Sequence, residues 1–329
     1  MDVKFKMAIM TMVQAINSAL KQEMERDKSV IVLGEDVGID GGVFRVTDGL
    51  LNVFGPERII DTPLAELGIV GTSIGLALGG MKPVAEIQFD GFIYSAVDQM
   101  ISHLSRVRNR SRGRYKCPVV IRFPYGGGIK ALEHHSEAME ALFAHIPGLK
   151  VVIPATPYDA KGLLISAIRD PDPVIFMEPK RVYRAIKEDV PETEYMVEIG
   201  KANVRKEGSD VTLIAWGSTV KMSLDMLDKL TNVSVELIDL RTISPMDTET
   251  ILNSVRKTGR VVIVHEEPQS FGTGAEIMAR ITERELLSLK APIKRVTGYD
   301  VPTPYPKLED YYLPNASRVT KAIEEVMKF

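Results

Sequence analysis

The stretch that decides the fold is IIDTPLAELGIVGTSIGLALGGMKPVAEIQFDGFIYSAVD, residues 59–98. Thr62 and Pro63 predict a helix start, because a threonine hydroxyl can accept a bond from a free backbone N–H and proline fits the first helical position. One acid, Glu66, follows in the predicted helix. Residues 83–89 then have the character of a strand, and a second helix is expected directly after it.

Four glycines recur three or four residues apart along the predicted helix: Gly68, Gly71, Gly75 and Gly79. Each glycine costs a helix interior about 1 kcal/mol relative to alanine. The pattern therefore predicts that another backbone or a flat ligand packs closely against this side.

Glu66 has two interpretations from spacing alone. It is either a carboxylate that interacts favourably with the helix dipole or a buried acid poised for proton transfer, because burial among aliphatic groups raises a carboxyl pKa. Phe89 and Phe92 are expected from spacing to be core aromatics.

The composition of the 329-residue chain is ordinary for a soluble globular protein, with a formal net charge of -3. This length favours two domains, and the charge balance indicates no general nucleic-acid or membrane surface. A single cysteine, Cys117, excludes an internal disulfide framework. The apolar residues at the N-terminus are interrupted by polar ones and lack a cleavage site, so a cytoplasmic location is expected.

Continuous apolar runs of the kind found in buried parallel strands alternate with helical patterns along the whole chain. The predicted strands of the first half are 29–34, 83–89, 117–123, 149–154 and 174–177; those of the second half are 211–216, 233–240, 261–265 and 293–297. The fold class is therefore α/β. The predicted domains are 1–185 and 203–329, joined by a linker at 186–202.

Two other patterns suggest chemistry only weakly. His134 and His135 are adjacent, so they cannot both face one metal ion from regular structure, and no G-x-S-x-G elbow supports Ser136 as a hydrolase nucleophile. Alternate arginines at 106–114 lack interleaved aromatic residues, so a solvated helix end is favoured over a nucleic-acid site. Gly272 and Gly274 fall short of a dinucleotide-binding pattern and are expected to be structural.

Three segments in order, DTPLAELGIVG, EIQFDGFIYSAVDQ and HHSEAMEALFAHIPGLKVVIPATPYDAKGLL, resemble the beta subunits of thiamine-diphosphate-dependent 2-oxo acid dehydrogenases. The resemblance covers essentially the whole chain. It implies two doubly wound open-sheet domains, namely a transketolase-like pyrimidine-binding domain and a transketolase C-terminal domain.

The resemblance also implies roles for individual residues. Glu66 would hydrogen-bond a pyrimidine ring nitrogen of the cofactor, and His135 would be the catalytic histidine, with His134 a neighbour of unassigned role. Further cofactor contacts are expected from Glu35, Leu64, Gln88 and Phe92, the last by stacking on the pyrimidine. A structural potassium ion, held mainly by backbone oxygens, is implied at Ile121, Ala167, Ile168, Asp170 and Asp172.

The sequence contains no Gly-Asp-Gly motif followed by paired asparagines, the pattern that binds magnesium and diphosphate in this enzyme class. The chain is therefore expected to bind only the pyrimidine half of thiamine diphosphate. By resemblance, an alpha subunit supplies the magnesium and diphosphate half in an alpha-two beta-two tetramer, which docks on a lipoylated acyltransferase core.

The segments HHSEAMEALFAHIPGLKVVIPATP and MEPKRVYR favour a branched-chain 2-oxo acid as substrate, with pyruvate as the alternative. A non-catalytic scaffold of the same fold is a further alternative, against which the joint presence of Glu66, Phe92 and His135 argues. A transketolase or deoxyxylulose-phosphate synthase would need its phosphate-binding domain on the same chain.

Overall fold

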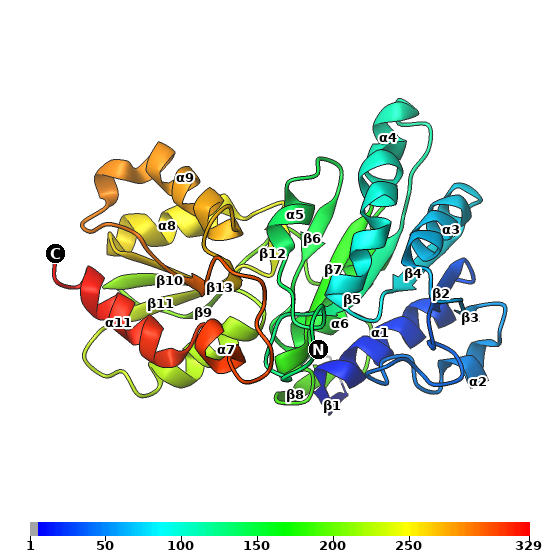
Figure 1. Ribbon diagram of the computed structural model, residues 1–329, viewed down its shortest axis with the longest axis horizontal. Helices are drawn as coiled ribbons and strands as arrows, with labels where there is room; N and C mark the ends of the chain where they lie inside the picture. Colours follow the sequence, from blue (N-terminus) through cyan, green and yellow to red (C-terminus); the bar gives the residue numbers. More distant parts are fainter. Residues whose placement is uncertain (1–5) are drawn as a thin grey trace, which may run out of the picture.

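The computed structural model describes residues 6–329 and consists of two α/β units, each built on its own sheet (Figure 1). Residues 1–5, where the first predicted domain begins, lie outside the described residues. The prediction of an α/β protein with two doubly wound open sheets is confirmed. No helix within residues 6–329 has the length and apolarity needed to cross a membrane.

The first sheet has seven strands in the order β12-β6-β7-β5-β4-β2-β3, and all are parallel except the edge strand β12. Their bounds are β2 Val30–Gly34, β3 Ile59–Asp61, β4 Lys82–Glu86, β5 Val120–Tyr125, β6 Lys150–Val152, β7 Val174–Pro179 and β12 Thr242–Ser244. The central strands are buried on both faces, which is why their sequences are continuous apolar runs.

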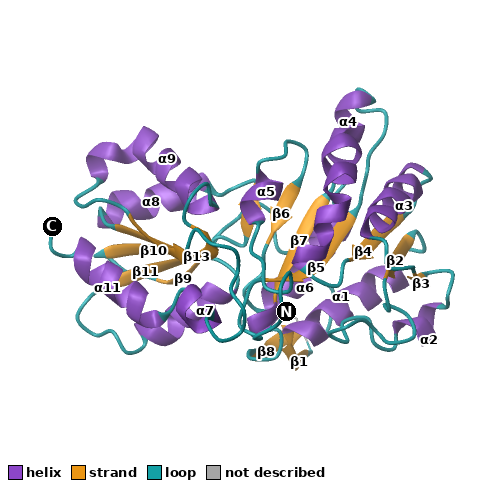
Figure 2. Ribbon diagram, viewed as in Figure 1, coloured by secondary structure: helices purple, strands orange, loops and turns teal. Residues whose placement is uncertain are grey.

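Helices cover both faces of this sheet (Figures 1 and 2). The helices α1 (Met12–Arg26) and α6 (Pro157–Arg169) pack on each other over one face and share an apolar core that also takes in residues near α2 (Leu50–Phe54). The opposite face carries α3 (Glu66–Leu78), α5 (Glu140–Ala144) and the helical turns that end in α4 (Val107–Arg110).

The second sheet has five strands in the order β14-β13-β10-β11-β9, of which only β9 is antiparallel. Their bounds are β9 Asn203–Lys206, β10 Val211–Ala215, β11 Val235–Asp239, β13 Val261–Pro268 and β14 Lys294–Gly298. The helices around it are α7 Ser218–Leu227, α8 Thr248–Thr258, α9 Thr273–Glu285, α10 Glu309–Tyr312 and α11 Ala316–Val326. In Figure 1, α8 and α9 lie on one face, and α7 and α11 on the other.

The two units are joined by more than the chain connection. The strand β12 belongs to the C-terminal half in sequence, yet it pairs with β6 of the first sheet. One apolar core also continues from the first sheet to Trp216, Ile238 and Ile277 of the second unit. The C-terminal half therefore contacts the first sheet both by strand pairing and through a shared apolar core.

A two-stranded sheet lies near the N-terminus and the predicted linker. The helix α1 begins at Met12, because Met7–Thr11 form a strand, β1, and Thr11 caps the helix by accepting a bond from the N–H of Gln14. The stretch 186–202, expected as a linker, contains β8 (Lys187–Pro191), which pairs with β1.

The central stretch also differs from expectation. The helix α3 begins at Glu66 rather than near Thr62, because the N–H of Thr62 is bonded to the carbonyl oxygen of Gly34 and residues 62–65 are not helical. The second helix is broken into short turns of differing pitch: η1 (Asp90–Ala96) and η3 (Leu104–Arg106) are 3-10 helices, and η2 (Gln99–His103) is a π-helix. Glu66 consequently becomes the first residue of its helix.

Candidate active site

The residues predicted to form the site follow four neighbouring parallel strands of the first sheet. Glu35 follows β2, Glu66 follows β3, Gln88 follows β4, and His135 lies on the loop after β5. Because the carboxyl ends of parallel strands meet at one edge of the sheet, these side chains lie at the edge where open α/β sheets bind ligands.

Glu66 lies in the first turn of α3, where the helix dipole favours a negative charge. Its carboxylate accepts one hydrogen bond, from the Ser95 hydroxyl at 3.3 Å, and within residues 6–329 its other oxygen has no hydrogen-bond partner. The side chain is half-buried, so the interpretation of a fully buried acid is wrong for this chain alone. One oxygen of this partly exposed carboxylate is therefore available to a further hydrogen-bond donor.

Glu35 is a neighbour of Glu66 in space. Burial, together with the charges of Asp36 and Glu66, raises the pKa of Glu35 above its ordinary value. The side-chain amide of Gln88 donates a hydrogen bond to Asp36 at 3.1 Å, which joins the turn after β2 to the end of β4. Leu64, by contrast, is 71% exposed and lies in the extended segment before Glu66.

His135 packs against two aromatic rings from the turn after β4. Its imidazole centroid is 4.3 Å from that of Phe89 and 5.0 Å from that of Phe92, and both phenyl rings also contact each other at 5.5 Å. The expectation that Phe89 and Phe92 are simply core aromatics is therefore incomplete, because they form the surface against which His135 is held.

The hydrogen bonding of His135 sets its tautomer. Its Nδ1 lies 2.7 Å from the carbonyl oxygen of Glu133. A carbonyl only accepts, so Nδ1 carries the hydrogen and Nε2 is the nitrogen that can accept a proton when the ring is neutral. His134 has a positive φ of 64°, and its exposed ring turns away toward Tyr94. Only His135 of the pair therefore contacts the phenylalanine rings.

The local backbone explains why glycine precedes Phe92. A Cβ at Gly91 would lie 2.3 Å from the carbonyl oxygen of His134, so only glycine lets the histidine loop approach this closely. Asp90, directly before it, is fully buried and accepts bonds from the N–H groups of Gly91 at 3.0 Å and Gly126 at 3.1 Å. Asp90 therefore ties the end of β4 to the loop that carries His135.

Sequence reasoning did not identify Ser95, Asp36 or Asp90 as part of this site. Ser95 lies three residues after Phe92, so a helical turn beyond Phe92 would have placed it near the same face. The roles of Asp36 and Asp90 depend on contacts across the sheet, for which the sequence contains no local signal.

The potassium ion implied at Ile121, Ala167, Ile168, Asp170 and Asp172 stays a prediction, and the side chains there have the following partners. Ile121 lies inside β5 and pairs with Ala85 and Ile175, while the carboxylate of Asp170 is bound by the ammonium of Lys150 at 2.5 Å. Asp172 is paired with Arg108 at 2.5 Å, and the carbonyl of Ala167 accepts a bond from the N–H of Asp170. Within residues 6–329, no group of three or more His, Cys, Asp or Glu side chains is arranged to hold a metal ion.

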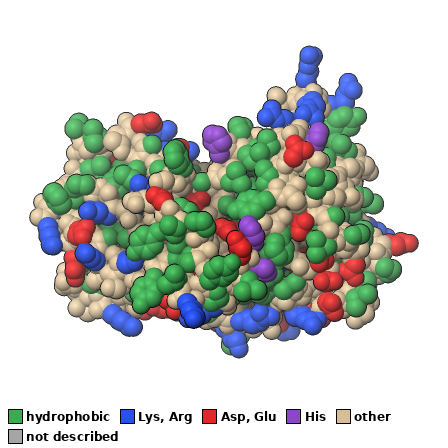
Figure 3. Space-filling model, viewed as in Figure 1, with side chains coloured by type: hydrophobic (Ala, Val, Ile, Leu, Met, Phe, Trp, Pro, Cys, Tyr) green, Lys and Arg blue, Asp and Glu red, His purple; other side chains and the backbone are tan. Residues whose placement is uncertain are grey.

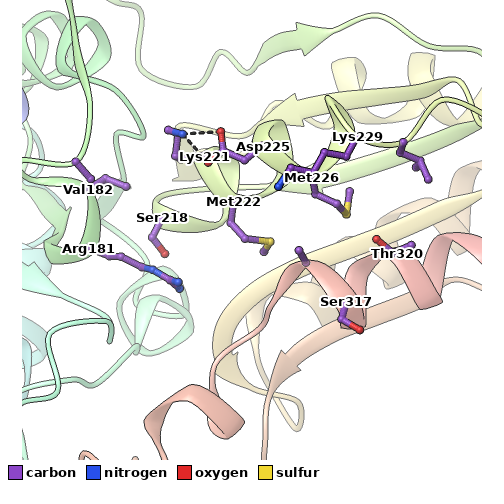
Figure 4. Close-up of a pocket in the computed structure, with 13 residues that line it drawn as sticks. Arg181, Val182, Ser218, Lys221, Met222, Asp225, Met226, Lys229, Ser317 and Thr320 are labelled. Carbon is purple, nitrogen blue, oxygen red and sulfur yellow. Dashed lines mark hydrogen bonds and ion pairs between the residues drawn. The ribbon is translucent and has the colours of Figure 1, made fainter.

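A separate cavity of about 540 Å³ lies between the turn at Arg181 and Val182 and the helices α7 and α11 (Figure 4). On its wall, Lys221 and Asp225 of α7 form an ion pair at 2.5 Å. None of the predicted site residues lines this cavity.

Comparison with known families divides the chain into two parts. Residues 8–186 match the family described as transketolase, pyrimidine binding domain, and residues 200–319 match transketolase, C-terminal domain. A solved structure titled "Split gene transketolase, inactive beta4 tetramer" superposes with a TM-score of 0.78 at 22% identity, covering 98% of this chain and 99% of its own. This similarity shows the shared fold.

Several curated relatives align over nearly the full length. A protein of Acholeplasma laidlawii is 53% identical over 325 residues, covering 98% of this chain and 99% of the relative. A protein of Bacillus subtilis is 50% identical, covering 98% and 100%. Both relatives are named pyruvate dehydrogenase E1 component subunit beta. The chain therefore belongs to the beta-subunit family of the thiamine-diphosphate-dependent 2-oxo acid dehydrogenases.

Proposed function

We propose that the chain is the beta subunit of a pyruvate dehydrogenase E1 component, which decarboxylates pyruvate and passes the acyl group to a lipoyl group. The observation that carries this proposal is the convergence of Glu66, Phe92 and His135 at one edge of the first sheet. The names of the relatives support pyruvate rather than the branched-chain substrate expected from the sequence.

Bound thiamine diphosphate would supply the electron sink that decarboxylation of a 2-oxo acid requires. Glu66 fits a role at the pyrimidine ring, because one of its oxygens has no partner among residues 6–329 and the helix dipole stabilises its charge. It would hold a proton shared with a ring nitrogen. A covering partner would exclude water from this half-buried carboxylate and strengthen that bond.

The other proposed contacts orient the ring and move protons. Phe92 would stack on the pyrimidine, with Leu64 and Gln88 beside it and Glu35 near the interface. His135 is held by its Nδ1, which leaves Nε2 directed away from Glu133 to give or accept a proton during decarboxylation or acyl transfer.

The exposed side of α3 supports an alpha subunit as partner. Leu64, Leu67 and Leu78 are 71%, 49% and 45% exposed, and a Cβ at Gly75 would meet no atom of residues 6–329 within 4 Å. The backbone or flat ligand that the glycine spacing predicts against this helix is thus not supplied by the described chain. We propose that the alpha subunit covers this face and brings the magnesium and diphosphate half of the site.

A second exposed apolar surface lies on the segment 299–311 at the centre of the face in Figure 3, where the orange-red loop crosses in Figure 1. Its large side chains are at least half-exposed: Tyr299, Val301, Tyr305, Leu308 and Tyr311. Exposed apolar surface of this kind marks protein contacts. We propose that both surfaces are buried in an alpha-two beta-two tetramer, which then docks on a lipoylated acyltransferase core.

Substrate preference is tested by assembling the chain with its candidate alpha subunit and comparing kcat/KM for pyruvate and 3-methyl-2-oxobutanoate. Because the added methyl groups must fit an apolar pocket, we expect about tenfold or greater preference for pyruvate. A preference for the branched substrate would reject the pyruvate assignment, and inactivity with both in a stable tetramer would favour a non-catalytic scaffold.

A further inference from the structure

The loop that follows β5 is held by carboxylates of the C-terminal unit. Glu309, the first residue of α10, accepts hydrogen bonds from the backbone N–H of Gly128 at 2.9 Å and of Lys130 at 3.0 Å, one on each carboxylate oxygen. The side chain is only 2% exposed. Hydrogen bonds to an ionised acceptor are roughly twice as strong as neutral ones, so these two bonds hold the loop backbone strongly to Glu309.

A second carboxylate of the same unit holds the start of the loop. Glu266 of β13 accepts the N–H of Gly127 at 2.8 Å and is 5% exposed. The preceding N–H, that of Gly126, is bonded to Asp90. Three successive N–H groups therefore point at three different carboxylates, two of which come from the C-terminal unit.

The glycine run explains how the loop comes so close to these acids. Gly126 and Gly128 have positive φ values of 76° and 98°, and a Cβ at Gly126 would lie 2.5 Å from an oxygen of Glu266. A Cβ at Gly127 would lie 3.1 Å from an oxygen of Glu309. These glycines therefore allow the loop backbone to approach the carboxylates closely.

A buried lysine balances the negative charge. The ammonium of Lys180 is inaccessible to solvent and lies 3.6 Å from Asp90. Burial lowers the pKa of Lys180, while the charges of Asp90, Glu266 and Glu309 oppose that effect. Lys180 also lies beside one of the two phenylalanine rings that pack against His135, since its Nζ is 5.7 Å from the centroid of the Phe89 ring.

The loop is also closed at its base. The N–H of Gly126 donates to the carbonyl oxygen of Glu137 at 2.7 Å, so residues 126–137 form one closed loop that contains His135. Because the two ends of this loop are joined, holding residues 126–130 in place also restrains the part of the loop that contains His135.

We propose that Glu309 and Glu266 are positioning residues, through which the C-terminal unit fixes the 126–137 loop and so sets His135 against Phe89 and Phe92. The effect on activity rests on the function proposed above, whereas the effect on the loop does not.

The first test is hydrogen exchange, followed by mass spectrometry, in peptides that cover residues 126–137 of the full chain. Glu309→Ala removes both acceptors, and we expect about tenfold faster exchange in this loop, the consequence of losing a hydrogen bond to a charged group. Glu309→Gln keeps one acceptor and should fall between. Asp310→Ala is the matched control, because the exposed Asp310 pairs with the side chain of Lys130 at 2.8 Å rather than with the loop backbone.

The second test is steady-state kinetics of the same variants in the assembled enzyme. We expect Glu309→Ala to lower kcat by about a hundredfold with little change in KM, because displacement of a catalytic group by about 1 Å costs this much. Glu309→Gln should recover part of the loss, and Glu266→Gln should lower kcat in the same way.

Unchanged exchange in a folded Glu309→Gln or Glu309→Ala chain would overturn the proposal. So would faster exchange with unchanged kcat, since the loop would then be fixed without consequence for His135. The exchange experiment needs neither partner nor cofactor, so an inactive wild-type assembly would count against the proposed function while the exchange result still decides the role of Glu309 in the loop.

Discussion

The imidazole of His135 lies edge-on to the ring of Phe92, with ring centroids 5.0 Å apart and planes inclined at 81°. This contact joins the end of β4 to the loop after β5, two segments separated by a whole strand in sequence. The Nδ1 of His135 is bonded to the carbonyl oxygen of Glu133, and this bond identifies Nε2 as the reactive nitrogen.

The adjacent histidines should differ sharply in importance. His135→Asn removes the imidazole Nε2 that can give or accept a proton, and we expect kcat of the assembled enzyme to fall by about 10²- to 10⁴-fold, the usual contribution of an acid-base group. His134→Asn changes an exposed ring that faces Tyr94 and should leave kcat nearly unchanged. Steady-state kinetics check both, and equal losses in the two variants would contradict the assignment.

Gly91→Ala should destabilise the chain. The added Cβ would lie 2.3 Å from the carbonyl oxygen of His134, so the backbone must shift, at a cost of about 1–3 kcal/mol in the free energy of unfolding. Gly75→Ala is the control, because its Cβ meets no atom of residues 6–329 within 4 Å and alanine favours a helix by up to about 1 kcal/mol. Urea unfolding of the isolated chain should therefore move in opposite directions for the two variants.

The buried ion cluster of Arg122, Glu86 and Glu178 should be sensitive to loss of its cation. Arg122 is 1% exposed and binds Glu178 at 2.6 Å as well as Glu86, and these carboxylates raise its pKa against the effect of burial. Arg122→Met leaves both acids unpaired, and we expect a loss of about 3–5 kcal/mol in the free energy of unfolding.

The control for that loss is the surface pair of Lys221 with Asp225, which is partly exposed on both sides. Lys221→Met should cost no more than about 0.5 kcal/mol. Similar urea midpoints for Arg122→Met and the wild type would show that the buried cluster contributes little.

Because of Asp90, the free energy of unfolding of the chain should fall as the pH rises. Burial raises the pKa of its carboxyl to about 7, although Lys180 and the N–H groups of Gly126 and Gly91 oppose the shift. An unfolded aspartate has a pKa of about 3.9. Between these values the folded chain holds a proton that the unfolded chain has released, so the free energy of unfolding falls by up to about 1.4 kcal/mol per pH unit.

Asp90→Asn keeps the shape of the protonated side chain and should remove this slope. Urea midpoints measured from about pH 5 to about pH 8 would show it as a flatter curve than that of the wild type. Asp98→Asn alters an exposed acid and should leave the slope in place. A wild-type slope that survives Asp90→Asn would contradict the effect of burial on this carboxyl.

The parts of the fold that follow from local pattern were predictable from the sequence. Residues 30–34 and 261–265 are strands because continuous apolar runs are buried on both faces, and both doubly wound sheets follow from their alternation with helices. The start of α3 at Glu66, rather than near Thr62, was not predictable, since the N–H of Thr62 is bonded to the carbonyl oxygen of Gly34 across the sheet.

The candidate site was predictable where family resemblance marked its residues, as for Glu66, Phe92 and His135. The carboxylates that hold the histidine loop were not, because Glu309 lies about 180 residues from the N–H groups that it accepts. The pairing of β1 with β8 was not predictable for the same reason, because the two strands are far apart in sequence.

The central claim is that this chain supplies the pyrimidine half of an active site that an alpha subunit completes. The most direct measurement is 2-oxo acid decarboxylation with thiamine diphosphate, magnesium and a dye acceptor, by the chain alone and mixed with its candidate alpha subunit. We expect activity only in the mixture, abolished by Glu66→Ala and unaffected by Glu57→Ala, which changes an exposed acid before β3. Activity of the chain alone, or full activity of the Glu66→Ala mixture, would contradict the claim.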